Sequence, residues 1–142
     1  MGHIELARWA DVMIIAPATA DVIARLAQGR ADDLLTTVAL ATPAPVAVAP
    51  AMNQQMWAHT ATQDNIQMLA SRDIQIIGPD AGEQACGDVG PGRLLEPEAI
   101  VAAVNARFKS RLLEGRRVVI TAGPTIEAID PVRYLRDRKS VV

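Results

Sequence analysis

Cysteine is nearly absent from this chain, with a single residue, Cys86, in 142 positions. One thiol cannot form a disulfide within the chain, and the C-x-x-C spacing of a zinc site does not occur, so we expect no disulfide and no metal site. Aromatic residues are also scarce, at 3%, although 50% of the residues are hydrophobic. Aliphatic side chains must therefore fill the core, which favours closely packed α/β layers.

Long apolar runs and an excess of basic charge are missing as well. No run approaches the roughly 20 apolar residues of a membrane-spanning helix, and the opening "MGHIELARWAD" is too polar for a signal peptide. The formal net charge of -2 gives no electrostatic reason to expect nucleic acid or an anionic membrane as a partner. We therefore expect a cytoplasmic protein with a reduced thiol.

Short β-type runs alternate with helical runs, which is typical of a parallel α/β sheet. Strands are predicted within 11–18, ending at Pro17, and within 44–53 and 74–80. The glycine-rich segment 84–93, "QACGDVGPGR", is interpreted as a loop. Helices are predicted at 4–11, 19–29, 31–41, 60–73 and 96–108, the second with Thr19 as N-cap and Gly29 as C-terminal stop.

The composition changes after position 108. The segment "KSRLLEGRR" is basic and polar and is interpreted as a linker, and "RVVITAGPTIEAIDPVRYL" then predicts a new strand and turn. An incomplete βαβ unit at each end leads us to expect a piece of a longer protein. The predicted organisation is one domain over 1–108, a linker over 109–116 and the start of a second domain over 117–142.

Candidate ligand-binding residues follow the predicted strands, because open parallel sheets bind ligands beyond the carboxyl ends of their strands. These ends read "APATAD", "APAMNQQMW" and "GPD", in which Thr19, Asp21 and Asn53 offer hydrogen bonds. A Pro-Ala pair after a strand is also a common way to turn the chain. Asn53 either caps the following helix or donates its amide N–H to a substrate carboxylate. Met52 and Met56 are expected to pack in the core.

Three other side chains have suitable chemistry. Cys86 lies among four glycines between positions 82 and 92, so its loop could close over a site and present a nucleophile or proton donor, or hold a cysteine without any such role. His3 is either a solvated terminal histidine or a general acid/base. His59 is interpreted as a surface residue.

Three motifs are more specific together than alone. "GHIELARWAD" at 2–11, "PAMNQQMW" at 50–57 and "ACGDVGPGR" at 85–93 occur in the order found in flavoprotein cysteine decarboxylases. About the first 105 residues closely resemble that family, in particular its 4'-phosphopantothenoylcysteine decarboxylases of coenzyme A biosynthesis. The segment "VVITAGPTIEAIDPVRYL" looks like the start of a phosphopantothenate–cysteine ligase, which many bacteria fuse behind the decarboxylase.

The resemblance implies a flavodoxin-like, Rossmann-like parallel sheet sandwiched by helices, with the N-terminal unit that helps to hold the FMN phosphate missing. It implies FMN as cofactor, 4'-phosphopantothenoylcysteine as substrate, and a homo-oligomer built from trimers with FMN at subunit contacts. In a full-length bifunctional protein, the ligase half would use CTP and Mg2+.

The resemblance also implies a role for each candidate residue. The substrate thiol is oxidised by two electrons, the carboxylate leaves as CO2, and the electrons return with a proton to give 4'-phosphopantetheine. Cys86 would supply this proton, Asn53 beside Met52 would bind the substrate carboxylate, and His3 would serve the oxidative decarboxylation. The implied flavin contacts are Thr19, Ala20, Asp21, Val22 and Ala51.

Two alternatives stay open. A peptide cysteine decarboxylase would share the asparagine motif, although the ligase-like segment favours the coenzyme A enzyme. A non-catalytic assembly subunit would share the fold, although the presence of His3, Asn53 and Cys86 argues against one.

Overall fold

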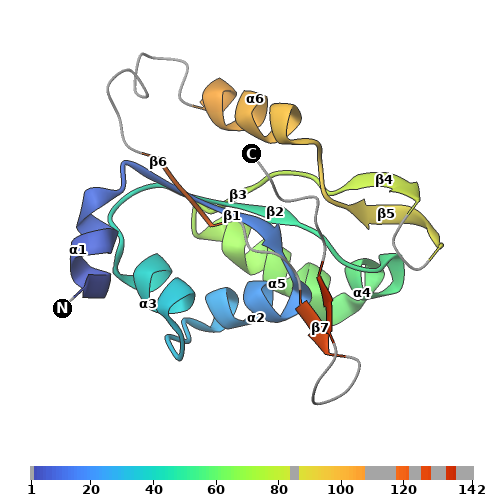
Figure 1. The fold of residues 1–142 in the computed structure, drawn as a ribbon, viewed down its shortest axis with the longest axis horizontal. Coiled ribbons are helices and arrows are strands. Elements are labelled where there is room, and N and C mark those ends of the chain that lie inside the picture. The colour runs from blue at the N-terminus through green and yellow to red at the C-terminus, as the bar shows by residue number, and fades with distance from the viewer. Residues whose placement is uncertain (1, 84–86, 108–117, 122–125, 129–133, 137–142) are drawn as a thin grey trace.

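The computed structural model describes residues 2–83, 87–107, 118–121, 126–128 and 134–136. Within these residues the centre is a four-stranded parallel sheet in the order β3-β2-β1-β6 (Figure 1). The parallel α/β sheet predicted from the sequence is therefore confirmed. Its strands are β1 (Val12–Ala18), β2 (Val46–Pro50), β3 (Gln75–Ile76) and β6 (Val118–Thr121).

Helices lie on both faces of the sheet (Figure 1). One face is covered by α2 (Ala20–Gln28), α3 (Leu34–Ala41) and α5 (Thr60–Ser71), and the other by α6 (Pro97–Arg107). These four helices agree with the predicted ones, and α2 ends as predicted at Gly29, which adopts a left-handed conformation with φ 67. None of the helices in the described ranges is long and apolar enough to cross a membrane.

Strand β1 is buried on both faces. Met13 and Ile15 pack into the core beneath α2, α3 and α5, whereas Val12 and Ile14 pack into the core beneath α6. This alternation follows from strand geometry, in which successive side chains point to opposite faces. Burial on both sides explains why the strand is a continuous apolar run. The helical side chains that complete the two cores are Ile23, Val38 and Leu69 on one face and Ile100 and Val104 on the other.

A hairpin takes the place of part of the loop predicted over 84–93. Strand β4 (Asp80–Glu83) pairs antiparallel with β5 (Val89–Arg93). Glycine usually weakens a strand, but it is favoured where another group approaches the backbone closely. Here the Arg93 side chain lies against Gly82, and a Cβ at Gly90 would clash with the Gln54 side chain. The glycines therefore serve packing within the hairpin at Gly82 and against the Gln54 side chain at Gly90, which the interpretation as a loop did not anticipate.

Three strands come from the segment in which the sequence predicts a second domain. Strand β6 pairs with β1 in parallel, with Val12 opposite Val118. Strand β7 (Ile126–Ala128) pairs antiparallel with β8 (Tyr134–Arg136). The predicted linker over 109–116 lies outside the described residues, and the domain boundaries stay a prediction.

The two ends of the parallel strands form two distinct edges of the sheet. We call the side where β1 and β2 begin the amino edge, and the side where they end, at Ala18 and Pro50, the carboxyl edge. Helix α1 (Gly2–Trp9) leads into β1 at the amino edge, where the Thr42 hydroxyl donates to the Ala7 carbonyl at 2.9 Å. Figure 1 shows α1 at one end of the molecule, and the β4–β5 hairpin with helix α4 (Gln54–Ala58) at the other.

The turn from α2 to α3 is held by Arg25 and three carboxylates. Arg25 pairs with Asp21 at 3.2 Å, with Asp32 at 3.5 Å, and with Asp33. Asp33 is also the N-cap of α3, and its Oδ1 accepts from the Thr36 N–H and the Thr36 hydroxyl, each at 2.7 Å. Hydrogen bonds from the Thr36 N–H and hydroxyl, and then the charge of Arg25, lower the pKa of Asp33.

Replacing this cap should destabilise the fold. Asp33→Ala is expected to cost about 1 kcal/mol of unfolding free energy at pH 7, because the Thr36 N–H loses its acceptor. Since the folded-state pKa of Asp33 is lowered, its stabilisation is complete above the unfolded pKa of about 4 and disappears as the pH falls below it. Urea unfolding of wild type and variant at pH 7 and near pH 3 measures this difference. The control Asp32→Ala, on the same turn but not a cap, should change stability by less than about 0.5 kcal/mol.

Candidate active site

The strand ends at the carboxyl edge lie side by side. Ala18 of β1 is paired with Pro50 of β2, and the Ala51 N–H donates to the Ala18 carbonyl at 3.0 Å. Ala18 is buried in the core, whereas Ala20 and Ala51 are partly exposed and have methyl side chains only, so a flat ligand can approach the backbone closely there. This is the edge at which open α/β sheets bind their ligands.

The start of helix α2 supplies hydrogen-bond donors at the same edge. Thr19 is the N-cap, as predicted, and its hydroxyl oxygen accepts from the Val22 N–H at 3.3 Å. The first hydrogen bond within the helix runs from the Ile23 N–H to the Thr19 carbonyl, so the N–H groups of Ala20 and Asp21, which come before Ile23, have no acceptor inside the helix. The Asp21 carboxylate turns to Arg25. Thr19, Ala20, Asp21 and Val22 therefore lie next to Ala51, and their contact with a flavin stays a prediction.

Asn53 follows β2 and begins the short helix α4. Its Oδ1 accepts from the Gln55 N–H at 2.8 Å, so the capping interpretation is confirmed. Its Nδ2 donates to Oδ2 of Asp88 at 2.8 Å. The two contacts define the orientation of the amide, because a flipped amide would place N–H against N–H and oxygen against oxygen. The amide of Asn53 thus holds a carboxylate, which is the chemistry that the second interpretation requires.

The β4–β5 hairpin is docked on the segment that contains Asn53. The Met52 N–H donates to the Gly92 carbonyl at 2.9 Å, and the Gln54 side chain packs against Gly90. Asp88, 35 positions from Asn53 in sequence, is brought to the carboxyl edge in this way. Asp88 is not among the site residues predicted from the sequence: it lies within the motif "ACGDVGPGR", but no pattern in the sequence indicates its partner.

Cys86 lies outside the described residues. The strands on either side are described, β4 ending at Glu83 and β5 beginning at Val89. Asp88, two positions after Cys86, contacts Asn53. The role of Cys86 as a proton donor stays a prediction.

His3 lies on α1 at the amino edge, where its side chain is half-buried. β1 separates the two edges by about 20 Å, at roughly 3.3 Å per residue. Within one chain, His3 is therefore not brought together with Asn53. Any shared site of these two residues needs His3 from one copy of the chain and Asn53 from another.

The predicted burial of the remaining side chains is confirmed for two of them and wrong for one. Met52 is half-buried and packs against the core beneath α2, α3 and α5, as expected. Met56 is 49% exposed, so its placement in the core is wrong. It lies on the five-residue helix α4, which contributes no buried residue. His59 is exposed, as predicted, and accepts from the Ala61 N–H at the start of α5.

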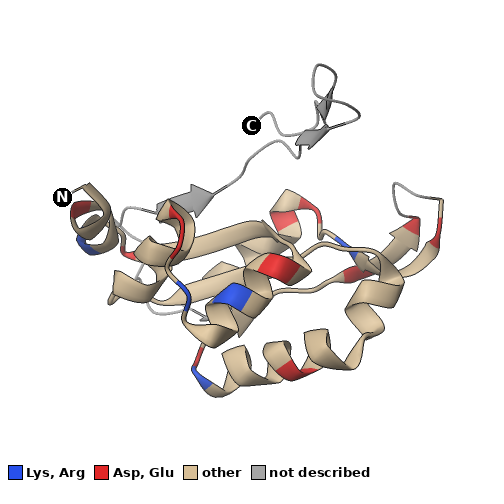
Figure 2. Cartoon of the chain, turned by 90° about the horizontal axis from the view of Figure 1, so that it is seen from below, with Lys and Arg blue, Asp and Glu red and all other residues tan. Residues whose placement is uncertain are grey.

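Charge at the hairpin is mainly acidic. Asp80, Glu83 and Asp88 carry negative charge there, and the single basic residue of its two strands, Arg93, pairs with Glu96. Figure 2 shows basic residues thinly spread over the described ribbon. Among the described side chains of the hairpin, carboxylates therefore outnumber cations. Across the same residues, no group of three His, Cys, Asp or Glu side chains is placed to hold a metal ion.

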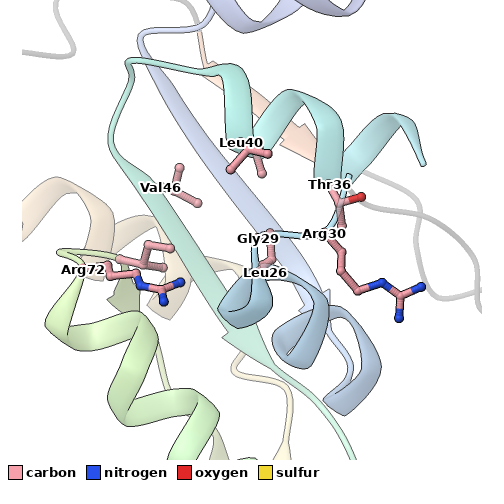
Figure 3. Close-up of a pocket in the computed structure, with 9 residues that line it drawn as sticks. Leu26, Gly29, Arg30, Thr36, Leu40, Val46 and Arg72 are labelled. Atoms are coloured by element: carbon pink, nitrogen blue, oxygen red, sulfur yellow. The ribbon is translucent and has the colours of Figure 1, made fainter. Parts of the chain in front are cut away.

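A cavity of about 140 Å³ lies away from these residues, near the amino edge (Figure 3). Its walls come from the end of α2, from α3, and from the starts of β2 and β3. The Arg72 guanidinium is engaged by the Ala27 carbonyl at 2.6 Å, and that of Arg30 points away from Val46 and Leu40. The cavity is thus lined mainly by apolar groups. The lining residues are Leu26, Gly29, Arg30, Thr36, Ala39, Leu40, Val46, Arg72 and Ile74.

The fold defines the class of this protein: a flavodoxin-like α/β protein, in which the carboxyl edge of the parallel sheet is the expected place for a ligand. The chain belongs to the flavoprotein family, whose profile, described as "Flavoprotein", matches residues 1–109. A second profile, described as "DNA/pantothenate metabolism flavoprotein C-terminal domain", matches residues 113–141.

Known proteins are similar over most of the chain. The coenzyme A biosynthesis bifunctional protein CoaBC of Vibrio cholerae is 62% identical over 140 residues, which is 99% of this chain and 35% of that protein. The chain thus spans about a third of this relative. A cysteine-to-serine mutant of a PPC decarboxylase complexed with pantothenoylaminoethenethiol has a TM-score of 0.75 and 39% identity, covering 78% of this chain and 62% of that chain. The FMN binding protein AtHal3 has a TM-score of 0.69 and 40% identity, covering 77% and 60%.

Proposed function

We propose that this chain is the decarboxylase part of a bifunctional coenzyme A biosynthesis protein. It removes the cysteine carboxyl group of 4'-phosphopantothenoylcysteine in an FMN-dependent reaction and gives 4'-phosphopantetheine. The observation that carries the proposal is the Asn53 amide, oriented by its helix cap and holding a carboxylate at 2.8 Å at the ligand-binding edge. The similarity to CoaBC and to PPC decarboxylase supports this substrate rather than another cysteine compound.

The carboxyl edge suits FMN. The methyl side chains of Ala20 and Ala51 leave room for a flat ring, and the N–H groups at the start of α2 favour electron-rich groups. Thr19, Ala20, Asp21, Val22 and Ala51 would hold the cofactor. When bound, FMN supplies a two-electron oxidant for the substrate thiol and later returns the electrons.

The chain's own residues have separate tasks in this proposal. Asn53 donates to the substrate carboxylate without adding charge, and Met52 beside it lines the site. Cys86 donates the proton that the product gains when the electrons return. His3 acts as acid or base in the oxidative decarboxylation.

The location of His3 at the amino edge supports a site shared between copies of the chain. A homo-oligomer built from trimers, with FMN at each subunit contact, would bring His3 of one copy to Asn53 of the next. A closed ring of three copies satisfies every such contact.

The full-length protein would contain a second, ligase domain. Residues 117–142 would open a ligase domain, after a linker over 109–116, and that domain would join phosphopantothenate and cysteine with CTP and Mg2+. We place the protein in the cytoplasm, because a doubly charged phosphate ester does not cross a membrane unaided.

An assay of the full-length protein tests the proposed function. The purified protein is expected to retain flavin absorbance after desalting and to form CO2 and 4'-phosphopantetheine in equal amounts. Cys86→Ser should still release CO2 but form 4'-phosphopantetheine at least about 100-fold more slowly and accumulate the oxidised enethiol, because the proton donor is lost. Mass spectrometry of the products measures both.

The other outcomes identify the alternatives. Faster decarboxylation of a peptide ending in cysteine would make the protein a peptide cysteine decarboxylase. If the protein retained no flavin and released no CO2 from either substrate, it would be a non-catalytic subunit. Unchanged product formation by Cys86→Ser would refute the proton-donor role alone.

A further inference from the structure

The amide that would bind the substrate carboxylate already donates to a carboxylate of the chain. Asn53 Nδ2 lies 2.8 Å from Oδ2 of Asp88, which is a normal length for a hydrogen bond. The Gln55 N–H fixes the opposite end of the amide, so Asn53 cannot turn away without giving up its cap. The Asp88 carboxylate and the substrate carboxylate would therefore use the same amide.

Two carboxylates on one side of the same amide repel each other. Asp88 and the substrate each present a carboxylate, and like charges within hydrogen-bonding distance of a shared donor oppose joint occupancy. The hairpin brings two other acidic residues, Asp80 and Glu83, and its only cation, Arg93, is paired with Glu96. No described cation on the hairpin therefore offsets this repulsion.

The hydrogen bond between Asp88 and Asn53 can break at a small cost in free energy. Asp88 is exposed, so its carboxylate regains water when the contact breaks. A hydrogen bond exchanged with water in this way has a small net free energy. The hairpin also stays anchored without it, because the Met52 N–H donates to the Gly92 carbonyl.

We propose that Asp88 is a built-in competitor of the substrate: its carboxylate occupies the amide of Asn53 until the carboxylate of the substrate replaces it. This inference rests on the proposed function, since it takes Asn53 as the carboxylate site. The apparent affinity for a carboxylate ligand is lowered by the fraction of molecules in which Asp88 is bound to Asn53. Ligands without a carboxylate are not affected.

Binding of two unreactive analogues to the full-length FMN-loaded protein tests the inference. The first is 4'-phosphopantothenoylserine, which keeps the carboxylate but has no thiol to oxidise, and the second is its ethanolamine counterpart, which lacks the carboxylate. Calorimetric titration should show that Asp88→Ala binds the serine analogue about 3- to 10-fold more tightly than wild type, as expected for removal of one competing hydrogen bond. Binding of the ethanolamine analogue should not change.

Two further variants serve as controls. Asp88→Asn keeps the size of the side chain without its charge and should tighten binding of the serine analogue by a smaller factor. Asp80→Ala removes a carboxylate at the other end of the hairpin, where Asp80 accepts from the Ala81 N–H, and should change neither affinity.

Other binding results would overturn the inference. An amide nitrogen has two N–H groups, so Asp88 could instead orient Asn53 while the second N–H binds the substrate. Asp88→Ala would then weaken binding of the serine analogue, and the inference would be overturned while the proposed function stands. An equal change for both analogues would also overturn it. If wild type bound neither analogue, the proposed function would fail and the inference with it.

Discussion

Asn53→Asp is expected to lower kcat/KM for 4'-phosphopantothenoylcysteine by at least about 100-fold. The substitution replaces the donating amide nitrogen with a carboxylate oxygen, which repels the substrate carboxylate where the amide attracted it. A like charge at such a contact costs several kcal/mol, and about 2.7 kcal/mol corresponds to 100-fold. The new carboxylate also faces Asp88, because it takes the position of the Asn53 Nδ2, which lies 2.8 Å from the Asp88 Oδ2 in the wild-type protein. Decarboxylation kinetics of the full-length protein measure the loss.

The fold should tolerate this substitution. Aspartate is as good an N-cap as asparagine, so the Gln55 N–H keeps its acceptor and α4 keeps its start. Thermal unfolding should therefore be close to wild type while activity is lost. Asn105→Asp, an exposed change of the same kind on α6, is the matched control and should leave turnover unchanged. Full turnover by Asn53→Asp would mean that the substrate carboxylate is bound elsewhere.

The sheet and its capped helices could be predicted because their signals are local. Strand β1 is a continuous apolar run since both of its faces are buried, and Thr19 and Gly29 mark the two ends of α2 by their own chemistry. Helix α4 was missed because five residues are too few to show a helical period. Met56, which lies on that helix, was therefore assigned to the core although it is half-exposed.

The site could be predicted only in part because its contacts join distant segments. Glycines at 82 and 90 indicated a loop, and the packing partners that make them strand residues, Arg93 and Gln54, are not adjacent in sequence. The same packing brings Asp88 to Asn53. The pairing register of β4 and β5, rather than residue type, decides this contact, and the whole hairpin sets that register.

The topology of the sheet likewise decides how His3 and Asn53 can cooperate. Helix α1 enters β1 at the amino edge, whereas Asn53 follows β2 at the carboxyl edge. A proton transfer needs heavy atoms about 3 Å apart, but the length of β1 separates the two edges by about 20 Å. If both residues serve one reaction, each active site must combine two copies of the chain.

Mixed oligomers test this arrangement with a large expected effect. His3→Asn and Asn53→Asp should each be inactive alone, by at least about 100-fold. When full-length chains of the two variants are co-expressed in equal amounts and purified through two different tags, activity per chain should return to about a third of wild type. The reason is that a subunit contact is intact only when its two sides come from the appropriate variants, and a mixed ring of three has about one such contact in three.

A second mixture makes the result unambiguous. Wild type co-assembled with the double variant His3→Asn/Asn53→Asp and purified through both tags should show only about a sixth of wild-type activity per chain, because both sides of a contact must then be wild type. If His3 and Asn53 instead acted within one chain, the first mixture would stay inactive and the second would retain about half of the activity. The two arrangements therefore predict opposite orders for the same pair of measurements, and a failure of the subunits to mix would be visible as an absence of doubly tagged oligomers. A shared site would also explain why a residue at the amino edge and one at the carboxyl edge belong to a single set of motifs.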